Sequence, residues 1–165
     1  MSDLSRSFGF QSVDEVEREQ RIRRVFQAVA PRYDLMNDAM SFGIHRLWKR
    51  SFARQAKPQA GQVIVDLAGG TGDVAALMAG ADRRVMVCDP SLAMMQYGQA
   101  RGLRHVEWLS GSGEAIPLAD NSVDTLTIAF GIRNVTRIDL ALAEIHRVLK
   151  PGGRFLCLEF SRPWA

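Results

Sequence analysis

The chain has 165 residues, of which 47% are hydrophobic and 24% charged, so it is long enough to bury the core of one soluble domain. No apolar run reaches the length of a membrane span, and no hydrophobic secretory signal opens the chain, so a cytoplasmic location is expected. The net charge of +3 is uneven: residues 1–60 hold 11 Lys and Arg against 7 Asp and Glu, whereas residues 61–165 hold 10 against 11. A solvated helix face is the common explanation and an anionic lipid surface the alternative, while the lack of an aromatic-interleaved basic stripe argues against nucleic acid.

The first 60 residues carry helical patterns. A capping box at Ser12 and Glu15 predicts a charged helix over about 13–30. After an irregular connector, helical spacing returns over 44–56, where one apolar stripe is formed by Ile44, Leu47, Trp48 and Phe52. We expect this part of the chain to form a helical cap.

From residue 61 onward, strand and helix patterns alternate. The expected strands cover 63–67, 84–88, 105–109, 122–130 and 154–160, and the expected helices cover 73–80, 91–101 and 139–149, the last with Thr136 as its cap. This alternation predicts an α/β fold with a doubly wound, mostly parallel sheet, in which residues 61–165 are the core and residues 1–60 its cap. The two cysteines, Cys88 and Cys157, lie in strand-like runs without metal or disulfide spacing and are expected to be reduced core thiols, with no metal site.

The most informative stretch is the turn after the first predicted strand, Asp66-Leu67-Ala68-Gly69-Gly70-Thr71-Gly72-Asp73. Its glycines allow positive φ and let a ligand lie against bare backbone. The spacing matches neither G-x-G-x-x-G nor the phosphate-binding loop, which disfavours a nicotinamide-dependent reductase. Because Asp73 at the helix start repels a pyrophosphate, a cationic or zwitterionic ligand is favoured. An ordinary glycine-rich turn without a ligand stays open from these residues alone.

Asp89 ends the next predicted strand, at the position where a carboxylate accepts hydrogen bonds from ribose hydroxyls. An adenosyl ligand without a pyrophosphate points to S-adenosyl-L-methionine. The loops at 110–114 and 131–135 follow two further strands, so they are expected at the same carboxyl edge of the sheet.

With these residues placed, the chain resembles class I S-adenosylmethionine-dependent methyltransferases and, more narrowly, the ubiquinone/menaquinone biosynthesis C-methyltransferase family. The glycine turn carries the wider likeness. The narrower likeness is carried by three segments: residues 33–50, including Tyr33-Asp34-Leu35-Met36-Asn37; Phe130-Gly131-Ile132-Arg133-Asn134-Val135; and Arg147-Val148-Leu149-Lys150-Pro151-Gly152-Gly153 with Leu158-Glu159-Phe160-Ser161.

The resemblance implies transfer of a methyl group to a ring carbon of a demethylated polyprenyl benzoquinol or naphthoquinol. It implies that Arg133 stabilises a developing phenolate and that Asn134 orients the quinol hydroxyl. His45 is interpreted as structural rather than as a base. The implied cofactor-binding residues are Tyr33, Asp66, Gly69, Gly70, Thr71, Gly72, Asp89, Ser112, Gly113 and Ala129.

Members of that family continue beyond this C-terminus with two more strands and a segment over the substrate pocket, so the last strands of the usual seven are expected to be missing here. Ser112-Gly113 replaces an Asn/Asp-Ala pair beside the adenine, and Ala129 replaces a frequent serine. These departures favour an alternative, a truncated or degenerate relative that binds the cofactor or partner proteins without turnover.

The expected partners follow from the same reasoning. A polyprenyl quinol lives in the bilayer, so the basic helices of residues 13–56, with Phe42, Trp48 and Phe52, are expected to rest on the inner membrane face as a peripheral contact. A second copy of the chain or a quinone-biosynthesis complex is a further expected partner.

Overall fold

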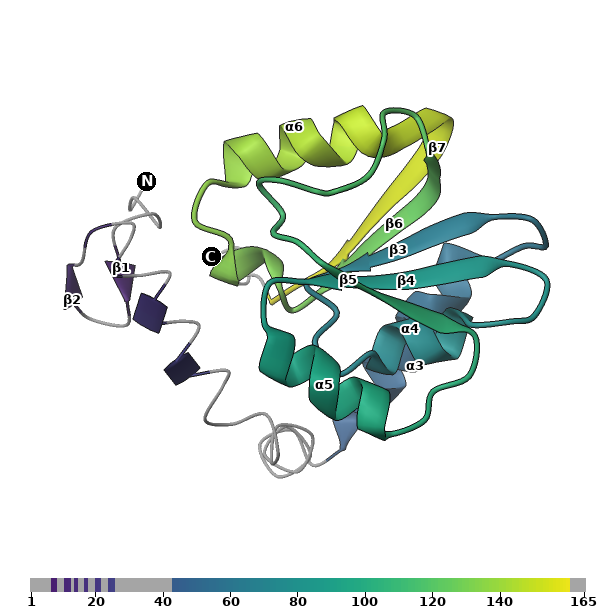
Figure 1. Ribbon diagram of the computed structural model, residues 1–165, viewed down its shortest axis with the longest axis horizontal. Coiled ribbons are helices and arrows are strands. Elements are labelled where there is room, and N and C mark those ends of the chain that lie inside the picture. Colours follow the sequence, from purple (N-terminus) through teal and green to yellow (C-terminus); the bar gives the residue numbers. More distant parts are fainter. Residues whose placement is uncertain are drawn as a thin grey trace, which may run out of the picture.

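The computed structural model describes residues 43–160 and, ahead of them, Ser7–Phe8, Gln11–Ser12, Asp14, Glu17, Gln20, Arg21, Arg24 and Val25. A five-stranded sheet runs through the described part, and every neighbouring pair of its strands is parallel (Figure 1). Its order is β5-β4-β3-β6-β7, formed by β3 (Val63–Leu67), β4 (Arg84–Asp89), β5 (Val106–Ser110), β6 (Val123–Ala129) and β7 (Leu149–Leu158). The predicted parallel sheet is thus confirmed.

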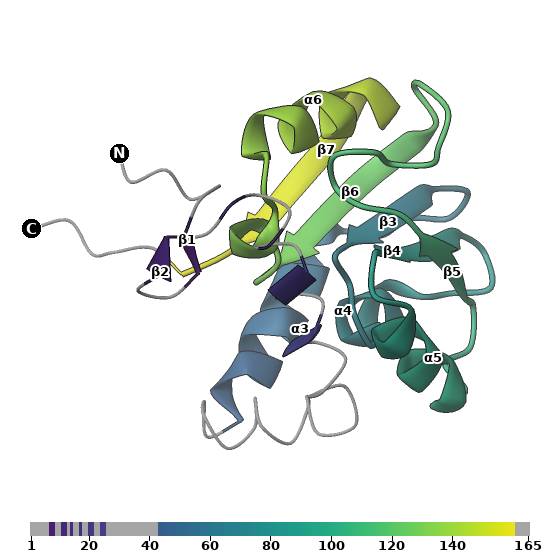
Figure 2. The same ribbon diagram turned by 60° about the vertical axis from the view of Figure 1, so that its left-hand side comes forward.

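Helices cover both faces of this sheet, which confirms the doubly wound architecture. On one face lie α3 (Ile44–Ala56), α4 (Asp73–Met78) and α5 (Leu92–Ala100), and on the other lies α6 (Ile138–Val148) (Figures 1 and 2). The chain moves outward from β3 through β4 to β5, then returns to β6 beside β3, so the loops after β3 and β6 meet at one edge. None of the described helices is long and apolar enough to cross a bilayer.

The start of the chain differs in part from its prediction. A two-stranded antiparallel pair, β1 (Ser7–Phe8) with β2 (Gln11–Ser12), was not foreseen. Because Ser12 lies in β2, the capping role falls to Asp14, whose carboxylate accepts a bond from the Glu17 amide at 2.7 Å. The remaining helix residues of 13–30, the connector with Tyr33, and Phe42 are mostly or wholly outside the described residues, and the division at residue 60 stays a prediction.

α3 has the predicted bounds, but the residues of its apolar stripe do not share one environment, and the expectation that Phe52 rests on a membrane surface is wrong because Phe52 is buried. Ile44, Leu47 and Trp48 are 45%, 62% and 41% exposed, and only Phe52 of that stripe is buried. The face turned inward instead carries His45, Ala53 and Ala56 beside Phe52. Two alanines let the helix approach closely, and Arg154 of β7 donates to the Ala56 carbonyl, which ties its end to the sheet.

The second half of the chain brings two local corrections. Thr136 does not cap α6, because the Glu114 carboxylate accepts from the amides of Thr136 and Arg137 at 3.0 and 3.2 Å. The Lys-Pro-Gly-Gly turn before the last strand is a bulge within β7, since Val123 pairs with Leu149 whereas Thr125 pairs with Arg154.

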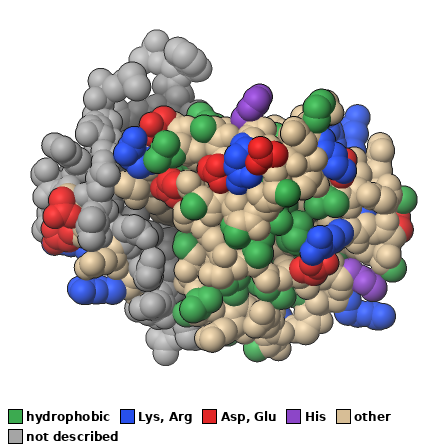
Figure 3. All heavy atoms as spheres, turned by 45° about the horizontal axis from the view of Figure 1, so that its top comes forward, with side chains coloured by type: hydrophobic (Ala, Val, Ile, Leu, Met, Phe, Trp, Pro, Cys, Tyr) green, Lys and Arg blue, Asp and Glu red, His purple; other side chains and the backbone are tan. Residues whose placement is uncertain are grey.

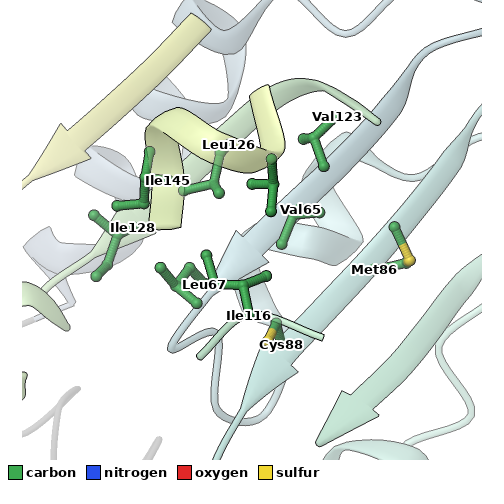
Figure 4. Close-up of a cluster of buried hydrophobic side chains, with 10 residues drawn as sticks. Val65, Leu67, Met86, Cys88, Ile116, Val123, Leu126, Ile128 and Ile145 are labelled. Atoms are coloured by element: carbon green, nitrogen blue, oxygen red, sulfur yellow. The ribbon is translucent and has the colours of Figure 1, made fainter. Parts of the chain in front are cut away.

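The core beneath α6 is built from alternate residues of the central strands, packed against that helix (Figure 4). Cys88 is completely buried there, as predicted. Cys157, in contrast, is exposed, so its assignment as a core thiol is wrong. β7 is the outermost strand on its side of the described sheet, and its alternation packs Leu156 and Leu158 toward the α3 side and leaves Cys157 on the opposite face.

Candidate functional site

A cavity of about 240 Å³ opens at the carboxyl edge of the sheet, between the ends of β3 and β6 and the helices α3 and α4. It gathers six of the residues that the sequence singled out for a site, together with others. It is lined by His45, Lys49, Asp66, Ala68, Gly69, Gly70, Thr71, Asp73, Val74, Ala129, Phe130, Arg133 and Phe160.

The glycine turn forms the wall of this cavity because side chains do not fit there. A Cβ on Gly69 would lie 2.7 Å from a carboxylate oxygen of Asp66, and Gly70 has a φ of +56°. Two non-glycine residues of the lining, Ala68 and Phe130, also have positive φ, at 52° and 57°. Left-handed backbone at such residues costs about 1–3 kcal/mol each and is typical of functional sites.

Asp66 stands at the inner end of the cavity. It is 1% exposed, and its Oδ1 accepts from the Thr127 hydroxyl at 2.9 Å across the β3–β6 pair. Its Oδ2 is buried and accepts no hydrogen bond from any residue of the described chain. Burial raises the pKa of Asp66 to about 7, and the Thr127 bond, the Ala75 backbone amide and the Lys49 charge only partly oppose this. This carboxylate oxygen is therefore prepared to accept a proton-bearing group of a ligand.

Asp89, the predicted ribose partner, is buried next to the glycine turn. Its two oxygens accept from the amides of Gly70 and Ser91 at 2.9 and 2.8 Å, while burial raises its pKa. Because each carboxylate oxygen has a second lone pair, it can still accept a hydroxyl hydrogen bond. Asp89 does not itself line the cavity, but it fixes the backbone that does.

A chain of charges crosses the outer part of the site. Asp73, at the start of α4, accepts from Lys49 of α3 at 2.9 Å and from Arg101, after α5, at 2.7 Å. Burial alone raises the pKa of the Asp73 carboxyl, but the two cations outweigh it and the net shift is downward. The predicted repulsion of a diphosphate by Asp73 is thus softened by two neighbouring cations.

The mouth of the cavity is aromatic and carries Arg133. The rings of Phe130 and Phe160 stack with centroids 4.9 Å apart, and Trp48 meets Phe160 edge-on at 5.7 Å. The Arg133 guanidinium lies 5.4 Å from the centroid of Phe160 and 3.6 Å from a Glu159 oxygen. Asn134 follows it in the short 3₁₀ helix η3 (Ile132–Asn134).

The predicted adenine-side residues lie apart from this cavity. Ser112 and Gly113 lie in the loop after β5, where Ser112 pairs with Ala115 and Gly113 is buried. Among the other predicted residues, Gly72, Asp89 and Asn134 also lie outside its lining, and Tyr33 is outside the described residues. Their binding roles stay predictions.

Sequence reasoning missed Lys49 and Phe160, both of which line the cavity. Lys49 stands four residues after His45 in α3, so the helical period puts both on one face. This spacing was the feature of the sequence from which a shared position at the cavity could have been predicted. No comparable signal existed for Phe160, whose place depends on β7 pairing with β6.

Comparison with known proteins agrees with this geometry. Residues 14–165 match the ubiE/COQ5 methyltransferase family. The chain belongs to this family. A relative from Rubrivivax gelatinosus named ubiquinone/menaquinone biosynthesis C-methyltransferase UbiE is 81% identical over 160 residues, covering 97% of this chain and 64% of the relative. A relative of the same name from Caulobacter vibrioides is 48% identical over 99% of this chain and 69% of its own. The chain thus spans about two thirds of the length of these relatives.

Solved structures show the same fold. A SAM-dependent methyltransferase from Aquifex aeolicus is 27% identical and superposes with a TM-score of 0.56, covering 62% of this chain and 58% of its own. A SAM-dependent methyltransferase from Thermotoga maritima, 23% identical, covers 82% of this chain and 60% of its own with a TM-score of 0.66. The sheet order described above is that of these methyltransferases.

Proposed function

We propose that this chain binds S-adenosyl-L-methionine and transfers its methyl group to a ring carbon of a demethylated polyprenyl benzoquinol or naphthoquinol in ubiquinone/menaquinone biosynthesis. Membership of the ubiE/COQ5 family and the name of the relative that is 81% identical support it. The structural observation that carries most weight is the buried Oδ2 of Asp66, which has no bond within the described chain and faces a cavity walled by glycines.

The residues present fit this cofactor. An amino-acid end offers an ammonium group, and a buried carboxylate oxygen without a donor is its natural partner. The bare backbone of Gly69 and Gly70 leaves room where a Cβ would collide with Asp66 or strain the turn. Asp89, held by the Gly70 amide, is the residue we assign to the ribose hydroxyls.

When bound, the cofactor supplies an electrophilic methyl group on a sulfonium. A quinol carbon attacks well once the adjacent hydroxyl has lost its proton, so the chain must favour the phenolate and hold the ring in line. We assign phenolate stabilisation to Arg133, whose guanidinium is held at the mouth by the Phe130 carbonyl at 3.3 Å and by Glu159. Asn134 orients the hydroxyl, and the aromatic mouth offers the ring an apolar surface.

The test is a methyl-transfer assay on a demethylated quinol. Arg133→Ala is expected to lower the rate at least about 100-fold while changing the affinity for S-adenosylhomocysteine by less than about threefold. Arg137→Ala is the matched control, because Arg137 is exposed, pairs with Asp139 and stands outside the lining of the cavity. Equal rates for the two variants would refute the role of Arg133.

A second function has its own support in Ser112, Gly113 and Ala129, which depart from the family pattern at three predicted cofactor positions. In this reading the chain binds the cofactor, or partner proteins, without turnover. Calorimetric binding of S-adenosylhomocysteine with no methyl transfer to either quinol class would favour it.

The proposal extends to the membrane, where the quinol resides. α3 exposes Ile44, Leu47 and Trp48 next to exposed basic residues, Arg46, Arg50 and Arg54. On the described part of the face shown in Figure 3, basic side chains instead lie beside acidic ones. We assign the contact with anionic lipid to α3, on the cytoplasmic side of the membrane. Co-sedimentation with phosphatidylglycerol vesicles should exceed that with phosphatidylcholine and fall with salt; equal binding to both would contradict it.

A further inference from the structure

Lys49 is a cation in the lining of the cavity, although the sequence motifs assign it no role. It projects from α3 toward the start of α4, and its side chain is only 12% exposed. An ammonium group has three donors. Among the described residues, one of them is used, in the 2.9 Å bond to Asp73 Oδ2. Lys49 therefore has hydrogen-bonding capacity left in a largely enclosed position that lines the cavity.

The Asp73 carboxylate is not used by Lys49 alone. Asp73 shares its single negative charge between Lys49 and Arg101, one carboxylate oxygen to each. A ligand carboxylate in the cavity would meet the donors of Lys49 that Asp73 does not use. The Asp73 carboxylate holds the ammonium in place and, within the described chain, leaves two of its three donors unused.

The same cavity also contains a group with the opposite preference, the Asp66 carboxylate. Asp66 Oδ2 is buried, lacks a donor among the residues that the structure describes, and sits where the Lys49 charge is felt. A dianion such as a phosphate would be repelled by the Asp66 carboxylate, and a plain cation would be repelled by the Lys49 ammonium. A zwitterion can pair its ammonium group with Asp66 and its carboxylate with Lys49.

We infer that Lys49 binds the carboxylate of the amino-acid end of the ligand, opposite Asp66 at its ammonium, and so selects nucleosides that carry a complete amino acid. This inference rests on the proposed S-adenosylmethionine function and adds to it a specificity-determining residue from α3. It also gives α3 a role in the site, since the helix reaches the cavity through this side chain and His45.

The experiment is calorimetric binding of three adenosine thioethers: S-adenosylhomocysteine, its analogue without the carboxylate, and 5′-methylthioadenosine, which lacks the whole amino acid. The unmodified chain is expected to bind S-adenosylhomocysteine at least about tenfold more tightly than the decarboxylated analogue. Lys49→Met should reduce that preference to less than about twofold, while its affinity for 5′-methylthioadenosine changes by less than about twofold.

Two controls separate recognition from structure. Lys49→Arg should keep most of the preference, because a guanidinium also binds a carboxylate. Arg50→Met removes the same charge from the next, exposed position of α3 and should leave all three affinities unchanged. A preference retained in Lys49→Met overturns the inference.

The unmodified chain alone is decisive if Lys49→Met does not fold. Should it bind S-adenosylhomocysteine and the decarboxylated analogue equally, the inference about Lys49 fails and the proposed function stands. Should it bind none of the three nucleosides, both fail.

Discussion

Asp66 is buried as deeply as the leucines of the core, yet its pKa of about 7 leaves it partly ionised near neutral pH. The local turn made Asp66, Gly69, Gly70 and Thr71 predictable as one site, because they are neighbours in sequence and share one edge of the sheet. Lys49 comes from 24 positions before Asp73, and only the docking of α3 on α4 brings the two charges together. Residue-scale chemistry was therefore predictable where it is local and not where it depends on packing.

The pH dependence of stability follows from Asp66. Between pH 3.8 and about pH 7, Asp66 in the folded chain still holds a proton that it has already lost in the unfolded chain. The free energy of unfolding therefore falls as pH rises through this window, by up to about 4 kcal/mol from this group. Asp66→Asn cannot titrate at this position, so its unfolding free energy lacks this pH-dependent fall. The stability of the variant relative to the unmodified chain should therefore increase from pH 4 to pH 8. Urea unfolding of both proteins at four pH values measures this change. A difference in unfolding free energy that is the same at all four pH values would contradict the prediction.

Gly69→Ala probes the cavity wall. The added Cβ would come within 2.7 Å of the Asp66 carboxylate and 2.9 Å of its carbonyl oxygen, and the latter is backbone that cannot rotate away. A loss of about 1–3 kcal/mol in unfolding free energy is expected, together with weaker binding of S-adenosylhomocysteine. Gly113→Ala is the control for stability, since its Cβ would meet only ordinary contacts at 3.5 Å or more. Chemical unfolding of both variants gives the comparison. Equal losses of unfolding free energy would contradict the prediction that the backbone at Gly69 leaves no room for a Cβ atom.

At the scale of elements, the boundaries were more predictable than the faces. Helical spacing located α3 to the residue, but the buried face depends on what the helix packs against. Ala53 and Ala56 allow a closer approach to the strands and α4 than Leu47 and Trp48 would, so the smaller side chains face inward. The bulge in β7 could not be predicted from the sequence either, because it is a shift in register relative to β6 and depends on how the two strands pair.

Gly98 tests how α5 is held. An alanine in a helix ordinarily stabilises it relative to glycine by about 0.5–1 kcal/mol. Here the new Cβ would lie 2.2 Å from the Trp108 ring and 2.7 Å from the Thr71 carbonyl oxygen. Gly98→Ala is therefore expected to destabilise the chain by about 1–3 kcal/mol and to disturb the glycine turn through Thr71.

The matched control for that variant lies two positions earlier in the same helix. Gln96 is exposed, so Gln96→Ala should change the unfolding free energy by less than about 0.5 kcal/mol. Thermal unfolding of the two variants side by side gives the comparison. A stabilised Gly98→Ala would mean that α5 can move away from β5.

For the whole molecule, the alternation of strands and helices was sufficient to predict a parallel, doubly wound sheet, because parallel neighbours require helical crossovers. What the pattern did not contain is the difference between the central strands and the outermost strands of the described sheet. Cys88 on β4 and Cys157 on β7 lie in similar apolar runs, yet one is buried and the other exposed. Position within the sheet, a property of the assembled chain, separates them.

This difference provides a readout of global opening. A thiol reagent should label Cys157 first, because it is exposed, although partial burial and the Glu159 charge raise its pKa. Cys88 is buried and burial raises its pKa to about 12, so it should react only when the sheet opens. In Cys157→Ala, the slow labelling of Cys88 then reports the population of the opened chain. A ligand that binds only the folded chain stabilises it by about 2.7 kcal/mol at a concentration 100 times its Kd. S-adenosylhomocysteine at that concentration should therefore slow Cys88 labelling about 100-fold. At that concentration the ligand occupies the folded chain, so labelling of Cys88 at an unchanged rate would show that this thiol is reached without global opening.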